Sequence, residues 1–148
     1  MIRQFYRLLS LLLITLPLAS HANESDSVKE FDHHRVHYSV FNSTFLQPDV
    51  ARSYGLKRGG NIGIVNIAVH QKTDAGNVAI KAKLKGKTSN LIQQQESLDF
   101  LPIEEGSAIY YLASFRFSNE EVLHYTIEIE TADGQQLTLK FTHKLYQE

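Results

Sequence analysis

The chain of 148 residues contains no cysteine and no tryptophan. Without cysteine, no disulfide bond can cross-link the fold, so the protein must be stabilised by its hydrophobic core. Lipid attachment to an amino-terminal cysteine and catalysis by a cysteine nucleophile are excluded for the same reason.

Common catalytic signatures are also missing. There is no Gly-x-Ser-x-Gly elbow and no His-Glu-x-x-His motif. Two adjacent glutamate pairs occur, Glu104–Glu105 and Glu120–Glu121, but consecutive side chains point to opposite faces of a strand. The sequence therefore predicts a protein that is not an enzyme, with no catalytic residues and no cofactor.

The most apolar segment is too short to cross a membrane. It runs from Leu8 to Leu16, about half of the ~20 residues that a transmembrane helix needs. Arg3 and Arg7 precede it, and small residues up to Ala22 follow. This order is typical of a secretory signal peptide, and a membrane anchor is the less favoured alternative. We expect residues 1–22 to be cleaved off, no transmembrane segment in the mature chain, and a periplasmic location.

A strong excess of charge of either sign is absent. The chain has 15 Lys and Arg against 16 Asp and Glu, a formal net charge of −1. The first 22 residues hold two arginines and no acidic residue, so the remaining chain carries 13 − 16 = −3. This near neutrality argues against nucleic acid or a strongly anionic molecule as the partner.

Seven segments are predicted to be short strands, at a spacing of roughly ten residues that is typical of a β-sandwich. They cover residues 34–42, 61–71, 77–87, 90–101, 107–117, 121–131 and 136–146. Most of them alternate between apolar and polar side chains, whereas 61–71 is rich in β-branched residues on both faces, which suits a central strand, and 90–101 is weaker and glutamine-rich. The Asp133–Gly134 pair between the last two is a strong hairpin signal. The sequence predicts an all-β fold, a single antiparallel sandwich of immunoglobulin or fibronectin type with about seven strands over residues 33–148. The polar residues 23–32 are expected to form a flexible leader.

A short helix is predicted between the first two strands. Pro48 suits the first position of a helix, Asp49 complements the helix dipole, and Gly55 suits a left-handed cap. The pattern indicates a helix from Pro48 to Tyr54 that plugs one end of the sandwich.

A lysine row is predicted from the 77–87 segment. Its alternation places Val78, Ile80, Ala82 and Leu84 toward the core, and it places Lys81, Lys83, Lys85 and Lys87 on the other face. Such a row could make weak contact with anionic groups of lipids or of a partner. The favoured alternative is protection of an edge strand against aggregation.

The stretch FNSTFLQPDVARSYGLKRGGNIGIVNIAV resembles the signature of a proteobacterial envelope family catalogued as a domain of unknown function (number four-four-two-six). The matching residues are Phe41–Leu46, Pro48, Val50, Ala51, Tyr54, Gly55, Asn61 and Ile64–Val69. The run from Tyr111 to Phe117 extends the resemblance. Gly59–Gly60 stands where the family is expected to be more basic. The resemblance implies a periplasmic all-β domain and brings no activity with it.

The plugged end is the predicted interaction surface, with another envelope protein as the partner. It comprises Asn42–Leu46, the short helix and the loop Lys57–Gly63. Polar contacts are expected from Asn42, Ser43, Arg52 and Lys57, and apolar anchors from Phe45 and Tyr54. The alternative is that these residues only close the core.

The competing hypothesis is a copper or zinc site in the histidine cluster DHHRVH. Imidazole is a common ligand of both metals. His33 and His37 are expected on one face of the first strand and His34 on the other. The favoured alternative is a solvated start of that strand. His70, His124 and His143 are possible remote ligands.

Two further patterns have ordinary structural explanations. The segment Gly59–Gly63 could form a backbone anion site, but it lacks the strand–loop–helix context of a phosphate loop. Five aromatic residues could line a pocket, although alternating aromatics on strands more often form the core: Tyr110, Tyr111, Phe115, Phe117 and Tyr125.

Overall fold

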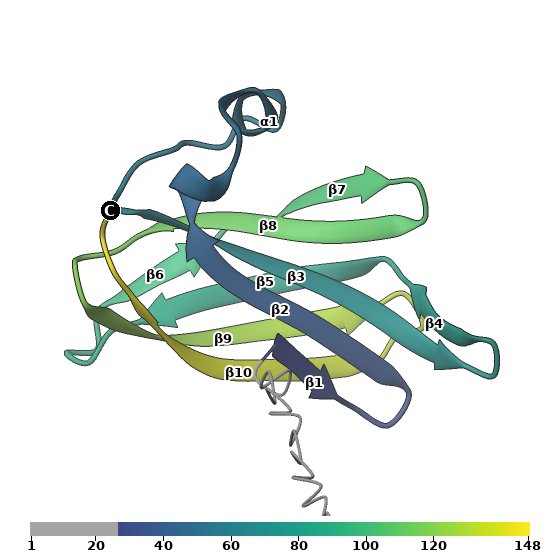
Figure 1. Ribbon diagram of the computed structural model, residues 1–148. Helices are drawn as coiled ribbons and strands as arrows, with labels where there is room; N and C mark the ends of the chain where they lie inside the picture. The colour runs from purple at the N-terminus through teal and green to yellow at the C-terminus, as the bar shows by residue number, and fades with distance from the viewer. Residues whose placement is uncertain (1–26) are drawn as a thin grey trace, which may run out of the picture.

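Ten β-strands and one short α-helix make up residues 27–148, the part of the chain that the computed structural model describes (Figure 1). The elements are β1 (Val28–Glu30), β2 (His34–Asn42), the 3₁₀ turn η2 (Ser43–Phe45), α1 (Pro48–Ser53), β3 (Ile62–Thr73), β4 (Gly76–Ala79), β5 (Ala82–Ser89), β6 (Gln95–Leu98), β7 (Leu101–Glu105), β8 (Ala108–Arg116), β9 (Glu121–Thr131) and β10 (Gln136–Leu145). The predicted all-β fold is confirmed, with about ten strands instead of seven.

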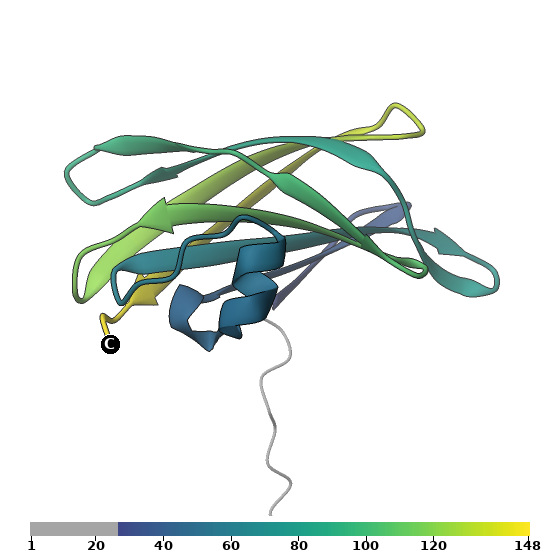
Figure 2. The same cartoon turned by 90° about the horizontal axis from the view of Figure 1, so that it is seen from above.

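The strands form two antiparallel sheets, seen as two layers from above in Figure 2. The first sheet has the order β1-β2-β3-β8-β7, with β4 paired to β3. The second has the order β10-β9-β5-β6. The predicted sandwich architecture is therefore present.

The core lies between the sheets and follows the predicted alternation. On β3, Val65, Ile67 and Val69 are fully buried, and Ile127 and Ile129 on β9 face them from the second sheet. Of the five aromatic residues that were expected to form the core, four are buried: Tyr111, Phe115, Phe117 and Tyr125. Burying a large apolar side chain contributes about 1.5–3 kcal/mol relative to exposure, so this layer dominates the stability.

The strand count differs because β1 and β7 are additional strands and because the predicted 77–87 strand changes sheets partway along. In the 77–87 segment, β4 pairs with β3 in the first sheet, and β5 pairs with β9 in the second. The crossing leaves Val78 in a two-stranded extension with no sheet facing it, and it is 52% exposed. The prediction that Val78 faces the core is wrong, whereas Ile80 and Leu84 do pack against the core.

The amino-terminal boundary also differs in part from the prediction. Within the expected leader, Val28–Glu30 forms β1 and pairs with Arg35–His37 of β2. The predicted signal peptide, residues 1–22, lies outside the described residues. Within residues 27–148 no helix is long and apolar enough to span a membrane.

The helix α1 forms where Pro48 predicts it, between β2 and β3. Figure 2 shows that it covers the outer face of the first sheet and does not cross the end of the sandwich. Ile64 and Ile103 point to that outer face, and they are 0% and 6% exposed. Ala51 of the helix is 2% exposed and belongs with them, outside the main core. The prediction that the helix closes the end of the sandwich was wrong. Apolar residues of β3 and β7 face outward and are buried by the helix, and the strand pattern alone does not reveal this.

Candidate functional site

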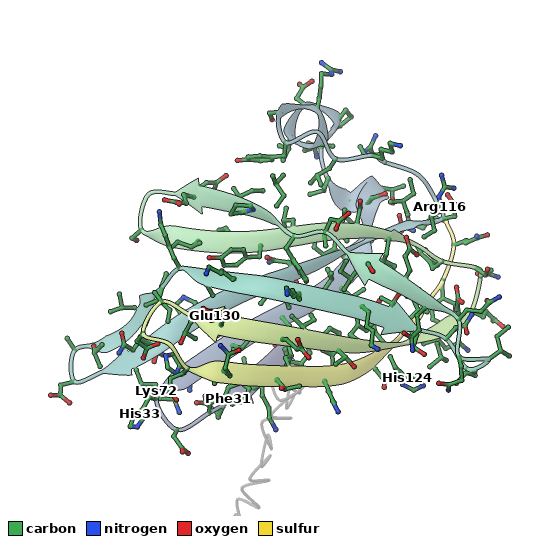
Figure 3. The ribbon with its side chains drawn as sticks, turned by 180° about the vertical axis from the view of Figure 1, so that it is seen from behind. Phe31, His33, Lys72, Arg116, His124 and Glu130 are labelled. Carbon is green, nitrogen blue, oxygen red and sulfur yellow. The ribbon has the colours of Figure 1, made fainter. Side chains whose placement is uncertain are left out.

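One end of the sandwich collects most of the residues that were predicted to bind a partner. At this end β2, β5, β8 and β10 finish and β3 and β9 begin (Figure 1). We call it the Phe45 end; it carries η2, the loop 56–61, the turn 90–94 and residues 146–148. Figure 3 shows Arg116 at this end and His33 at the opposite end.

The turn η2 is fixed by Asn42, which is 7% exposed. Its side-chain oxygen accepts hydrogen bonds from the amide and the hydroxyl of Thr44, both at 3.1 Å. Its side-chain amide donates to the carbonyl of Gly60 at 3.1 Å. An asparagine cap of this kind satisfies the free N–H groups at the start of the turn. Asn42 therefore connects the turn η2 to the loop 56–61 and is not exposed to a partner.

Ser43 has the same structural role. It is fully buried, and its hydroxyl donates to the carbonyl of Gly59 at 3.1 Å and accepts from the Gly59 amide at 2.9 Å. Arg58 adds a bond from its guanidinium to the carbonyl of Thr44 at 2.9 Å. Gly60 thus has a packing function, because a Cβ at this position would lie 2.4 Å from the backbone oxygen of Glu148.

The other predicted contact residues lie at the surface. Phe45 is 71% exposed. The Arg52 side chain is 79% exposed, and its guanidinium lies 3.3 Å from the Asp49 carboxylate. Lys57 is exposed, whereas Tyr54 is half-buried and donates its hydroxyl to Glu105 of β7 at 2.6 Å. This bond raises the pKa of Tyr54. Phe45, Arg52 and Lys57 are the members of the predicted set that a partner can reach directly.

A second projecting element at this end, the turn Asn90–Gln94 between β5 and β6, was missed. The sequence assigned these residues to a weak, glutamine-rich strand. In the structure Leu91 is 68% exposed and Ile92 is 74% exposed. The missed signal is Asn90, because asparagine side chains bond to backbone N–H groups a few residues ahead and so favour turns.

Asn90 makes this turn rigid. Its side-chain oxygen accepts from the amides of Ile92 at 3.2 Å and Gln94 at 2.9 Å. Its own backbone amide donates to the carbonyl of Gln94 at 3.0 Å. Gln93 takes a left-handed conformation with φ of 66°, which closes the turn. The two aliphatic side chains are therefore presented by a pre-formed loop.

A polar groove lies next to the turn. It has a volume of about 390 Å³, and Phe117 and Leu123 are among the residues that line it. Its polar lining includes Asn61, Asn90, Gln94, Glu96, Arg116 and Glu121. Such planar amide and charged groups can hydrogen-bond to a peptide or to a polar side chain of a partner.

The three histidines of the predicted metal site do not converge. His34 is 1% exposed and faces the interior, where its Nε2 lies 3.2 Å from the Asp133 carboxylate. His37 is on the other side of β2, and His33 lies in the bend that precedes β2, four residues away in the chain. Within residues 27–148 no three side chains of histidine, aspartate or glutamate are grouped closely enough to hold a metal.

In the lysine row, Lys83, Lys85 and Lys87 lie on the outer face of β5 in the second sheet, and Lys81 directly precedes β5. Carboxylates partly neutralise the row. Lys81 pairs with Glu104 at 2.9 Å, which raises the pKa of Lys81, and Lys83 lies 3.7 Å from Glu130. The amino half of β5 pairs only with β9, so its other edge is open. Lysines beside an open edge fit the protective explanation, and contact with anionic groups stays a prediction.

Comparison with known proteins identifies a matching family and similar solved structures. The sequence model of a family described as a domain of unknown function (DUF4426) matches residues 28–148. A crystal structure of a DUF4426 family protein from Pseudomonas aeruginosa PAO1 is similar, with TM-score 0.73, 34% identity, and coverage of 82% of this chain and 94% of that chain. FetP of uropathogenic E. coli strain F11, recombinantly expressed in the periplasm of E. coli, has TM-score 0.60 and 9% identity, with 83% and 95% of the two chains covered. At this identity the second likeness concerns the fold alone. No curated protein matches the chain.

Proposed function

The chain belongs to the DUF4426 family, and we propose that it is an exported periplasmic β-sandwich that binds another envelope protein through the Phe45 end. The role is that of a non-enzymatic binding or accessory module. The single observation that carries the proposal is the placement of the three most exposed large apolar side chains of residues 27–148. These are Ile92, Phe45 and Leu91, at 74%, 71% and 68%, and all three are at this end.

Rigid presentation supports a binding role for these side chains. The Asn42 and Asn90 hydrogen bonds fix both turns before a partner arrives. A pre-formed loop loses little conformational entropy on binding, so more of the burial energy remains as affinity. Each anchor that becomes buried contributes about 1.5–3 kcal/mol.

The surroundings of the anchors resemble the polar rim of a protein interface. Arg52 and Lys57 are exposed beside η2, and the amide-lined groove borders the 90–94 turn. Interfaces typically combine a few apolar anchors with such a rim. A protein partner is favoured over an anionic membrane because the groove side carries Glu96 and Glu121 close to the aliphatic anchors.

Capture from an envelope extract tests the proposal. Purified wild type is compared with Phe45→Ser, with the double variant Leu91→Ser/Ile92→Ser, and with Val78→Ser as the control, whose apolar side chain is exposed at the opposite end. Mass spectrometry is expected to identify one envelope protein that is captured by wild type and by Val78→Ser. Phe45→Ser and Leu91→Ser/Ile92→Ser should not capture it. Retention of the same proteins by all four would refute the assignment of this surface.

Export is tested separately. Fractionation should place the protein in the periplasm, and the intact mass should start at Asn23. A cytoplasmic protein that keeps residues 1–22 would contradict the proposed location and would leave the binding surface untouched.

A further inference from the structure

We propose that His37 and His70 form a binding site for a divalent late transition-metal ion, copper above all, on the outer face of the first sheet. The site is different from the DHHRVH cluster, because only one of its two ligands belongs to that cluster. It is also independent of the Phe45 end.

The strand register brings the two histidines together. His70 of β3 pairs with Arg35 of β2, and His37 of β2 pairs with Ala68. His37 and His70 are therefore diagonal neighbours on one face of the sheet. Their ring centroids are 5.1 Å apart and the ring planes are at 85° to each other.

This spacing fits two imidazoles on one ion. A metal–nitrogen bond is about 2.0–2.1 Å, which places the centroids of two rings that share one ion about 5 Å apart at the tetrahedral angle that zinc prefers, and about 4.5 Å apart at the right angle of a square-planar copper site. The two strand backbones already hold the rings near this separation. Diagonal pairs across adjacent strands are held by the sheet itself, so the ligands are pre-organised.

An unsatisfied nitrogen provides independent support. The Nδ1 atom of His70 is buried and has no hydrogen-bond partner within the described residues. A buried polar atom without a partner is rare in native proteins and calls for a reason. A coordinate bond to a metal would satisfy this nitrogen.

The neighbouring charges select the kind of ion. Arg35 and Lys72 both bind the carboxylate of Glu30, Lys72 at 2.7 Å, so no free carboxylate from this group faces the histidines. Calcium and magnesium require oxygen ligands and are disfavoured here. Copper, nickel and zinc bind imidazole strongly, and copper binds most tightly in that series.

Within residues 27–148 no further histidine, aspartate or glutamate joins the pair to make a group of three, so the proposed coordination is open. Water would complete the coordination sphere of copper or zinc in solution.

The proposal is tested by titrating the purified, untagged protein with Cu²⁺ alone. Binding is measured by calorimetry and by electron paramagnetic resonance. Wild type is expected to bind one ion with a signal typical of nitrogen ligation. His37→Ala and His70→Ala should each weaken binding at least tenfold. His33→Ala, which removes an exposed histidine in the bend just before β2, and His124→Ala, on the second sheet, should leave binding unchanged.

Circular dichroism of each variant verifies the fold. If His70→Ala does not fold, His37→Gln provides the decisive comparison, because His37 is only half-buried. Absence of saturable binding, equal binding by all variants, or loss of binding in His33→Ala would each overturn the proposal.

Discussion

The Nε2 atom of His34 on β2 lies 3.2 Å from Oδ1 of Asp133 in the β9–β10 turn. This contact joins the first sheet to the second at the end opposite Phe45. His34 is buried, and the Asp133 carboxylate also accepts a hydrogen bond from the Thr131 hydroxyl. The turn that the Asp133–Gly134 pair predicts is thereby attached to both sheets.

Stability should depend on the ionisation of Asp133. The hydrogen bond from Thr131 and the neighbouring His34 lower the pKa of this carboxyl group. The ionised Asp133 carboxylate therefore stabilises the fold fully at pH values above its pKa in the unfolded chain, about 3.9. This stabilisation is lost as the pH falls through the lower pKa of the folded protein. Urea unfolding should show Asp133→Asn to be less stable than wild type at neutral pH, with the difference shrinking in acid. The exposed Asp74→Asn is the control; a difference that grew in acid would contradict the assignment.

Ser43→Ala should destabilise the protein by about 1–3 kcal/mol, because the amide and carbonyl of Gly59 lose their buried partner. Ser53→Ala removes an exposed hydroxyl that bonds within its own helix, and it should change stability by no more than about 0.5 kcal/mol. Chemical denaturation measures the free energy of unfolding of both variants. Equal changes would show that the buried hydrogen bonds of Ser43 do not stabilise the protein.

Gly63→Ala should cost about 1–3 kcal/mol through overpacking. The added Cβ would lie 2.4 Å from the ring of Phe115, directly across the strand pair. At Gly59 the nearest atom to an added Cβ is the flexible end of Ile62 at 3.3 Å, so Gly59→Ala should be milder. Thermal unfolding of the two variants measures the difference, and a Gly63→Ala protein as stable as wild type would rule out the predicted clash.

Asn90→Ala should weaken partner binding without touching either aliphatic anchor. The turn loses the side-chain bonds to Ile92 and Gln94, and a released loop must be ordered again on binding. Gln93→Gly is the control, since glycine accepts the positive φ at that position without strain. Surface plasmon resonance with the captured partner measures both; unchanged affinity for Asn90→Ala would show that rigidity of the turn is irrelevant.

Arg52→Ala/Lys57→Ala should reduce capture of the partner moderately and mainly at low salt. Both side chains are exposed, so their electrostatic contribution is screened by ions. The melting temperature should stay the same. Capture that does not change at any salt concentration would remove these two residues from the interface.

Much of the local structure was predictable because a two-residue period is visible in the sequence. The predicted strands at 34–42 and 121–131 coincide with β2 and β9. The short helix begins at Pro48 as predicted, since proline restricts the backbone locally. The site was predictable only in part: Phe45, Arg52 and Lys57 are exposed as expected, whereas the burial of Asn42 and Ser43 depends on a loop sixteen or more residues away.

The sequence by itself determined the all-β class, the face on which most strand side chains lie, and the position of the helix along the chain. These properties depend on neighbours within a few residues. Tertiary structure alone decided which sheet receives each half of the 77–87 segment, that Leu91 and Ile92 share an end with Phe45, and that His37 meets His70. Pairing between strands depends on the free energy of the whole packed core, and alternation leaves the choice of pairing partner open.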